Sequence, residues 1–177
     1  GYVESGWGAA AAATDLGGGG MPSLVGLGIA ELFASANMAL SLNPTLTHGS
    51  IDLLEAWGTD AQKATYLPRL VSGEWTGTMD LTEPEAGSDV GAVRTRAEPN
   101  SDGTWAISGS KIYITWGEHD VAVNIIHFVL ARTPAAPAGT KGISLFVVPK
   151  LLTDETGRLG ERNAVRCTGI EHKLGIH

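Results

Sequence analysis

The sequence changes character once, near Glu74, and this change constrains the fold more than any other feature. Before Glu74, apolar residues recur three and four positions apart, which is the spacing of one helix face. After it, β-branched and aromatic residues gather in short runs between turn formers, as they do in strands. Because these runs do not alternate with helices, a parallel doubly wound sheet is not expected. The sequence predicts an α+β chain, with helices in residues 1–74 and a compact antiparallel β-domain in residues 75–177.

Residues 21–40 are the one stretch apolar enough to raise the question of a membrane span. Their apolar positions have helical spacing, and Pro22 falls in the first turn, where its missing N–H is not needed. The stretch carries a single charge, Glu31, but it also contains Gly, Ser and Asn. Its flanks lack the Lys and Arg of an anchored helix. We therefore expect a helix buried in a helical domain and no membrane span.

Two further helices are expected before the change of character. One runs over about residues 44–57 and stops at Gly58. The next begins at Thr59, because Thr59 and Gln62 have the spacing of a capping box. Pro68 should end or kink this helix, since proline lacks the N–H that a helix interior uses.

The second part contains strand-like runs separated by turns and loops. These runs are residues 76–81, 93–97, 105–108, 111–115, 121–133 and 143–148. The turn NSDG at residues 100–103 is expected to join two of them as a hairpin. A longer loop, rich in Pro and Gly, separates the last two.

Charge and cysteine content exclude some classes of function. The chain has 12 Lys and Arg against 19 Asp and Glu, a net charge of −7. A nucleic-acid-binding protein normally presents a basic face, so no nucleic-acid partner is expected. The single cysteine, Cys167, cannot form an internal disulfide. It suits a reducing compartment, and a cytoplasmic location is expected.

Histidines and carboxylates occur together in two places. The first is GEHD at residues 117–120 with His127, and the second is Glu171 and His172 with His177. Neither spacing fits a compact zinc pattern. We interpret these residues as solvated turn residues and expect no metal site.

The stretch MDLTEPEAGSDVG, residues 79–91, holds more hydrogen-bonding groups than a turn requires. Pro, Gly and Asp suffice for turn geometry, but Thr82 and Ser88 add hydroxyls. Gly87 and Ser88 also offer adjacent backbone N–H groups that an anionic phosphate can approach closely. The residues indicate a ligand-binding corner without identifying the ligand.

A second polar and aromatic stretch is KIYIT, residues 111–115. If it is a strand, Lys111, Tyr113 and Thr115 share one side. A flat tyrosine beside a hydroxyl is a plausible wall for a flat heterocycle. An ordinary sheet edge is the simpler interpretation from the residues alone.

The motif LTEPEAGSD at residues 81–89 resembles the signature of the acyl-CoA dehydrogenase family. At family-like distances follow ISGSKIYIT and KGISLFVVPK, which are similar to two further strands of that family. The stretches GEHDVAVNIIHFVLART and IEHKLGIH resemble the branch that contains 3-methylmercaptopropionyl-CoA dehydrogenase. Glu85 stands where the family commonly has glycine, at a turn position.

The resemblance implies a helical N-terminal domain, a β-barrel-like middle domain and a C-terminal four-helix domain, with FAD between the last two. It assigns contacts with the flavin to Met79, Leu81, Thr82, Gly87, Ser88, Tyr113, Ile114 and Thr115. Thr82 would hydrogen-bond the polar edge of the ring, and Tyr113 and Thr115 would flank it. Gly87 and Ser88 would face both the flavin and the acyl-CoA.

The reaction that the resemblance implies is α,β-dehydrogenation of an acyl-CoA thioester. A carboxylate removes the α-proton, and the β-hydrogen leaves as hydride to the flavin. The family's base is a glutamate of the C-terminal domain, expected beyond His177, so the chain itself should hold no catalytic residue and be inactive alone. Glu83 and Glu85 are expected to be scaffold or solvent-facing groups.

The same resemblance implies partners. These are an acyl-CoA substrate, an electron-transfer flavoprotein as electron acceptor, and further copies of the full-length protein in a homo-oligomer. Two alternatives stay open: a flavin oxidase or monooxygenase on the same scaffold, and a non-catalytic binding module that uses the β-domain as an interaction surface.

Overall fold

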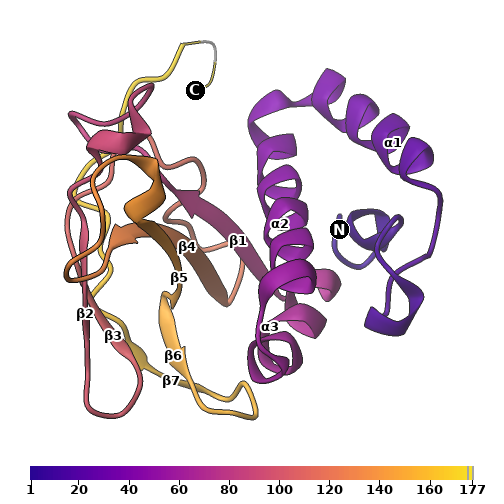
Figure 1. Cartoon of the computed structure of the whole chain (residues 1–177). Coiled ribbons are helices and arrows are strands. Elements are labelled where there is room, and N and C mark those ends of the chain that lie inside the picture. The colour runs from indigo at the N-terminus through magenta and orange to yellow at the C-terminus, as the bar shows by residue number, and fades with distance from the viewer. Residues whose placement is uncertain (175, 177) are drawn as a thin grey trace.

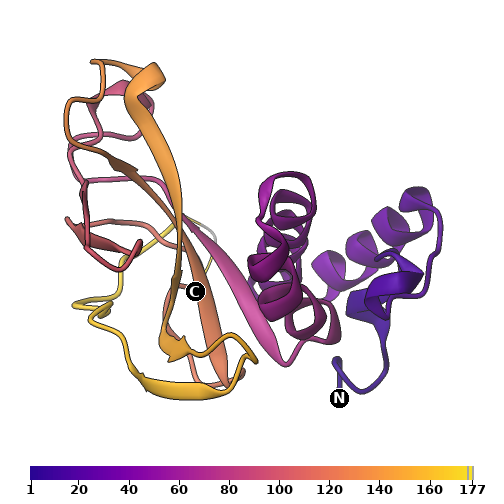
Figure 2. The same cartoon turned by 60° about the horizontal axis from the view of Figure 1, so that its bottom comes forward.

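The computed structural model describes residues 1–174 and 176 of the chain. Within them lie α1 (Ser23–Ala36), α2 (Met38–Trp57), α3 (Asp60–Ser72), β1 (Trp75–Asp80), β2 (Arg96–Pro99), β3 (Trp105–Ser108), β4 (Asn124–Arg132), β5 (Ile143–Pro149), β6 (Leu151–Thr153) and β7 (Leu159–Arg162). Four short 3-10 turns, η1 to η4, lie at Trp7–Ala9, Thr14–Leu16, Val90–Ala92 and Thr140–Gly142. Figure 1 and Figure 2 show α2 and α3 between α1 and the sheet. The predicted α+β order, helices first and strands second, is confirmed.

The capping box predicted before α3 is present. The Gln62 N–H donates to the Thr59 hydroxyl at 3.2 Å, and the Thr59 N–H donates to the Gln62 side chain at 2.9 Å. Of the two effects expected of Pro68, the end of the helix does not occur, because α3 continues to Ser72. Leu70 and Val71 follow the proline and are buried, so their packing holds the last turn.

Helix α2 begins earlier than expected. It starts at Met38, where the Asn37 side chain accepts a hydrogen bond from the Leu40 N–H at 2.9 Å. This N-cap contact satisfies a backbone donor that the first turn leaves free. Pro44 lies inside the helix and does not mark its start.

Helix α1 is not the buried helix that its apolar sequence predicts. It contains no buried residue, and Leu24, Leu27 and Leu32 are 79%, 66% and 73% exposed. The helix contacts α2 on one side, and Tyr2 of the N-terminal segment packs edge-on against Phe33. Helical spacing shows that a face is apolar but does not show what lies against it. No helix among the described residues is long and apolar enough to cross a membrane.

The main sheet is mixed, which corrects the expectation of a purely antiparallel domain. Strand β4 is central: it pairs in parallel with β1 and antiparallel with β5. Strand β2 pairs antiparallel with β3 and joins β4 through one parallel bridge, and β6 and β7 form a second small sheet. The long connection between β1 and β4 brings the chain back to the same end of the sheet, which a parallel pair requires.

Most expected strands are present, although their boundaries shift. The run 93–97 becomes β2, which begins later, at Arg96, and the NSDG hairpin joins β2 to β3. Residues 111–115 form no strand, since Tyr113 has a φ of 61°. Strands β6 and β7, of three and four residues, were not predicted.

The two faces of β1 have separate partners. Trp75 is fully buried against Leu54, Leu70 and Phe128 in the core between the helices and the sheet. At Gly77 the strand approaches α2 so closely that an added Cβ would lie 2.1 Å from the Ser50 hydroxyl oxygen. The alternate residues of β1 point to the other side of the sheet and hold the loops that form the candidate site.

Candidate functional site

The motif 81–89 follows β1 directly and forms a tight turn. The Glu83 N–H donates to the Ala86 carbonyl at 2.9 Å, and the Ala86 N–H donates to the Glu83 carbonyl at 3.1 Å. Gly87 and Ser88 come next and are exposed. The turn thus ends β1 and presents small residues at the surface.

Glu83 is the anchor of this turn rather than a surface group. It is 7% exposed, and its carboxylate accepts hydrogen bonds from the Arg94 N–H, the Thr95 N–H and hydroxyl, and the Lys111 ammonium at 2.5–3.0 Å. Burial by itself raises the pKa of Glu83, but the ammonium and the other donors outweigh it and lower the pKa to about 2. The expectation of a scaffold role agrees with this buried, fully engaged carboxylate.

Lys111 connects three parts of the chain. Besides Glu83, its ammonium donates to the Leu81 carbonyl at 3.1 Å and to the Leu130 carbonyl of β4 at 2.8 Å. An ammonium has three donors and no acceptor, so its hydrogen-bonding capacity is used. The motif turn, the segment 111–115 and the central strand are therefore joined at one buried point.

The prediction that Lys111, Tyr113 and Thr115 share one strand face is wrong. The Lys111 side chain is buried, whereas Tyr113 is 52% exposed. Isolated hydrogen bonds hold the segment, and it forms no strand ladder. The Ile112 N–H donates to the Thr82 carbonyl at 2.9 Å, and the Thr78 hydroxyl donates to the Thr115 carbonyl at 2.7 Å. These bonds place the segment beside the motif turn.

A lysine that the sequence did not single out completes this wall. The Lys173 ammonium donates to the Tyr113 carbonyl and to the Thr115 hydroxyl oxygen, both at 2.6 Å. Burial lowers the pKa of Lys173. Its role could not be read from the sequence, since nearly sixty residues separate it from its partners, and the stretch IEHKLGIH that contains it assigns it no role.

The structure brings together most of the residues predicted to contact a flavin. Thr82 and Gly87 are neighbours, since a Cβ on Gly87 would lie 3.6 Å from the Thr82 methyl group, and Thr82 is bonded to the segment that carries Tyr113, Ile114 and Thr115. Met79 and Leu81 are the residues directly before and after the end of β1. Ser88 lies in the same loop, and its side chain contacts none of the other seven through a hydrogen bond within the described residues.

The chemistry of this corner fits the FAD that the resemblance implies. The hydroxyls of Thr82, Ser88 and Tyr113 have no hydrogen-bond partner among residues 1–174 and 176, and Met79 and Tyr113 expose apolar surface. An isoalloxazine ring has flat apolar faces and a polar edge of nitrogen and carbonyl groups. Apolar contacts beside free hydroxyls are the set that such a ring requires.

The interpretation of His119 and His127 as solvated turn residues is wrong. His127 lies in β4, is 3% exposed and bonds the Asp80 carboxylate through Nδ1 at 3.0 Å. His119 is partly buried, bonds the Thr76 hydroxyl at 3.1 Å, and burial lowers its pKa. Both histidines fall on the side of β1 away from the helices, where strand alternation places inward-facing polar groups.

The other members of these clusters do not assemble into a metal centre. Glu118 pairs with Lys150 and Arg162. Glu171 and His172 are exposed, and His177 lies outside the described residues. Across residues 1–174 and 176, no group of three His, Cys, Asp or Glu side chains is close enough to hold a metal ion.

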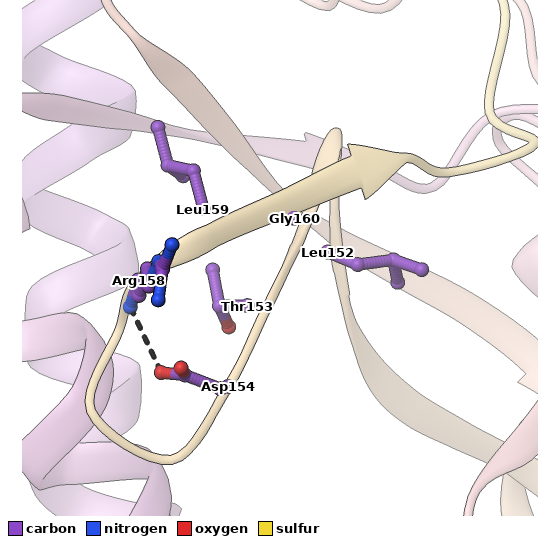
Figure 3. Close-up of a pocket in the computed structure, with 6 residues that line it drawn as sticks. All are labelled: Leu152, Thr153, Asp154, Arg158, Leu159 and Gly160. Carbon is purple, nitrogen blue, oxygen red and sulfur yellow. Dashed lines mark hydrogen bonds between the residues drawn. The ribbon is translucent and has the colours of Figure 1, made fainter.

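A surface hollow of about 470 Å³ lies at the β6–β7 hairpin, away from the candidate corner. Figure 3 shows its lining, which is Leu152, Thr153, Asp154, Arg158, Leu159 and Gly160. The Asp154 carboxylate accepts a hydrogen bond from the Arg158 N–H at 3.0 Å and so closes the hairpin turn. None of the predicted site residues lines this hollow, whose polar groups serve the turn.

Comparison with known proteins identifies the family. Residues 78–177 match the family model described as acyl-CoA dehydrogenase, middle domain, and residues 2–74 match acyl-CoA dehydrogenase, N-terminal domain. The 3-methylmercaptopropionyl-CoA dehydrogenase of Ruegeria pomeroyi is 54% identical over 99% of this chain. The chain spans 30% of the length of that relative.

Solved structures agree with this result. The butyryl-CoA dehydrogenase of Megasphaera elsdenii has a TM-score of 0.71 and 31% identity, over 82% of this chain and 38% of that one. A structure described as electron transferring flavoprotein of Acidaminococcus fermentans has a TM-score of 0.72 and 29% identity, over 83% of this chain and 37% of that one. Acyl-CoA dehydrogenases are FAD-dependent flavoproteins. By sequence and by fold, this chain belongs to the acyl-CoA dehydrogenase family.

Proposed function

We propose that the protein carrying this sequence is an FAD-dependent acyl-CoA dehydrogenase that oxidises the α,β-bond of an acyl-CoA thioester. The observation that carries the proposal is the corner where the motif turn meets segment 111–115. Hydroxyls without a partner in the described part of the chain lie there beside exposed apolar groups, and a buried Glu83–Lys111 pair anchors the corner. The family match adds the class of cofactor and reaction.

The corner's residues would hold the flavin and orient the thioester. Met79 and Leu81 would contact the ring, and the Thr82 hydroxyl would bond its polar edge. Tyr113, Ile114 and Thr115 would form the wall beside it. Gly87 and Ser88 would face both flavin and thioester, because no bulky side chain stands between them and the surface. When bound, FAD supplies the acceptor for the hydride that leaves the β-carbon.

Neither glutamate of the motif turn is available to remove the α-proton. Glu83 is committed to its buried donors. Glu85 is exposed and pairs with Arg94 at 2.8 Å. A general base must reach the proton that it abstracts, and neither group is free to do so. As the resemblance implies, we place the base outside residues 1–177, and we propose residues 1–74 and 75–177 as parts of two separate domains of the whole enzyme.

The substrate and partners follow from relatives. The 54% identical relative is named for 3-methylmercaptopropionyl-CoA, so a short thioether acyl-CoA is the first substrate to test. An electron-transfer flavoprotein is the electron acceptor that the family resemblance implies. A homo-oligomer would cover apolar surface such as that of α1. A cytoplasmic location suits a chain with one cysteine.

The test is a visible spectrum of the full-length protein, recorded before and after anaerobic addition of acyl-CoA thioesters. We expect a flavin spectrum that bleaches with 3-methylmercaptopropionyl-CoA or a short straight-chain acyl-CoA. A flavin spectrum that no thioester changes would favour the oxidase or monooxygenase alternative. A protein that contains no flavin and takes up no added FAD would contradict the proposal and favour a binding module.

A further inference from the structure

We propose that Lys173 is a positioning residue, which holds the Thr115 hydroxyl so that its hydrogen points to an acceptor on the polar edge of the flavin. The inference rests on the proposed function, because it requires a flavin at the corner. It adds a residue from the C-terminal segment of the chain to a site built from β1, the motif turn and segment 111–115.

One cation, the Lys173 ammonium, contacts both Tyr113 and Thr115. The Lys173 ammonium donates to the Thr115 hydroxyl oxygen and to the Tyr113 backbone carbonyl, each at 2.6 Å. Because the donor is ionised, both hydrogen bonds are charge-assisted. Lys173 therefore touches the hydroxyl itself and also the backbone that carries the aromatic ring.

The direction of the Thr115 hydrogen follows from the chemistry of the two groups. An ammonium only donates, whereas a hydroxyl has one hydrogen and two acceptor lone pairs. The Thr115 oxygen must therefore accept from Lys173, and its own hydrogen is left for a different acceptor. A hydroxyl that accepts from a cation is also polarised into a better donor. Among the described residues, no acceptor for this hydrogen is present.

The charge of Lys173 is itself uncompensated. No Asp or Glu within residues 1–174 and 176 forms an ion pair with it, and the ammonium is partly buried. Lys111, by contrast, has Glu83 at 2.8 Å. A partly buried cation without an anion favours added electron density nearby. Reduction of a flavin adds an electron pair to the ring, so Lys173 favours the reduced state.

The backbone supports a functional reason for this contact. Tyr113 has a φ of 61° and Trp116 has a φ of 55°, which non-glycine residues rarely adopt. Such backbone persists only where surrounding contacts hold it. The Lys173 bond to the Tyr113 carbonyl is one of those contacts, and the Trp116 indole bond to the Ala39 carbonyl at 2.9 Å is another.

The experiment uses the full-length holoenzyme and measures FAD affinity and the flavin reduction potential. Lys173→Met should weaken FAD binding about tenfold, and should favour the oxidised over the reduced flavin about tenfold, a fall of about 30 mV for a two-electron couple. Lys173→Arg should stay within about twofold of wild type, because a guanidinium also only donates. Lys141→Met, at an exposed lysine of η4, is the matched control and should change neither value.

A double-mutant cycle separates positioning from general stability. Thr115→Val should weaken FAD binding about tenfold, and adding Lys173→Met should weaken it by much less than tenfold more, since the hydroxyl that Lys173 orients is gone. Additive losses would overturn the positioning role. An unchanged potential in a folded Lys173→Met variant would overturn it too.

Two further results keep the test decisive. If Lys173→Met does not fold, the test uses Lys173→Arg and Thr115→Val instead. An arginine variant that binds FAD as weakly as the valine variant would contradict the inference. If the wild-type protein takes up no flavin, the proposed function fails. If wild type bleaches with a thioester and Lys173→Met matches it in affinity and potential, only this inference fails.

Discussion

At the scale of single residues, the corner separates groups that hold the fold from groups that face a ligand. Glu83 and Lys111 are buried and use their hydrogen-bonding capacity within the chain. Thr82 lies next to Glu83 in sequence, yet its hydroxyl has no hydrogen-bond partner among the residues that the structure describes. The motif therefore alternates scaffold and contact residues, which explains why it needs more polar groups than a turn.

Thr82 is the residue whose loss should affect the cofactor alone. Thr82→Ala removes a hydroxyl that bonds nothing else in the described chain, so FAD affinity should fall by about 1 kcal/mol, roughly fivefold, with little change in Tm. Isothermal titration of the apoprotein with FAD measures the affinity. Thr140→Ala, at an exposed threonine far along the chain, is the control. Equal affinity for Thr82→Ala and wild type would remove Thr82 from the site.

Glu83 should make the protein's stability depend on pH in a predictable window. Its pKa falls from about 4.5 in the unfolded chain to about 2 in the folded protein. The carboxylate therefore contributes stability above pH 4.5, of order 3 kcal/mol, and this contribution is lost as the pH falls from about 4.5 toward 2.

The matched pair Glu83→Gln and Glu85→Gln measures that contribution. Glu83→Gln leaves the Lys111 ammonium buried without an anion, so it should destabilise the full-length protein by about 3 kcal/mol at pH 6 and by clearly less at pH 3. Glu85→Gln breaks an exposed pair with Arg94 and should cost less than about 1 kcal/mol. Urea unfolding at both pH values gives the numbers. A Glu83 effect that does not shrink at low pH would refute the assignment.

At the scale of elements, local sequence patterns predicted which helices and strands exist better than they predicted how the strands pair. The capping box at Thr59 was correct, because its residues are neighbours in sequence. Residues 111–115 alternate like a strand but form none, because Tyr113 has a φ of 61°. The acceptors of the Lys111 ammonium lie on β4 and in the motif turn, which a local pattern does not reveal. The parallel pairing of β1 with β4 likewise depends on where a long connection returns.

The site was predicted to a similar degree. The motif identified Thr82, Gly87 and Ser88, and family resemblance added the segment that carries Tyr113, but the roles of these residues in flavin binding stay predictions. Lys173 was missed, because a contact between residues almost sixty positions apart leaves no local pattern. The exposure of α1 was missed for the same reason, because an apolar helix face does not show which part of the protein packs against it.

The close packing of β1 on α2 leads to a prediction at Gly77. A Cβ there would lie 2.1 Å from the Ser50 hydroxyl oxygen and 2.5 Å from the Ser50 Cβ. Gly77→Ala must push the strand away from the helix and should destabilise the protein by about 1–3 kcal/mol. Gly49→Ala, on the same helix with open space around it, should be neutral or slightly stabilising.

Thermal unfolding of the two alanine variants compares them directly. Adding Ser50→Gly to Gly77→Ala should recover part of the loss, although glycine in a helix itself costs about 1 kcal/mol. If Gly77→Ala is as stable as Gly49→Ala, the close contact between β1 and α2 is not as the structure describes it.

At the scale of the whole molecule, the chain is a helical layer and a β-domain whose candidate site lies at one end of the sheet. Figure 1 shows β1 pointing toward the end opposite the β6–β7 hairpin, and the motif turn follows the end of β1. The chain spans 30% of its 54% identical relative, so the proposed activity belongs to the full-length protein. The exposed outer face of α1 is where further parts of such an assembly would be expected to pack.

The most direct test of the account is hydrogen exchange of the full-length protein, measured by mass spectrometry with and without FAD. We predict that FAD slows exchange in peptides covering residues 79–89 and 111–116, and leaves the hairpin peptide 151–162 unchanged. Protein that binds FAD yet shows no protection in the first two peptides would contradict the assignment of this corner as the flavin site.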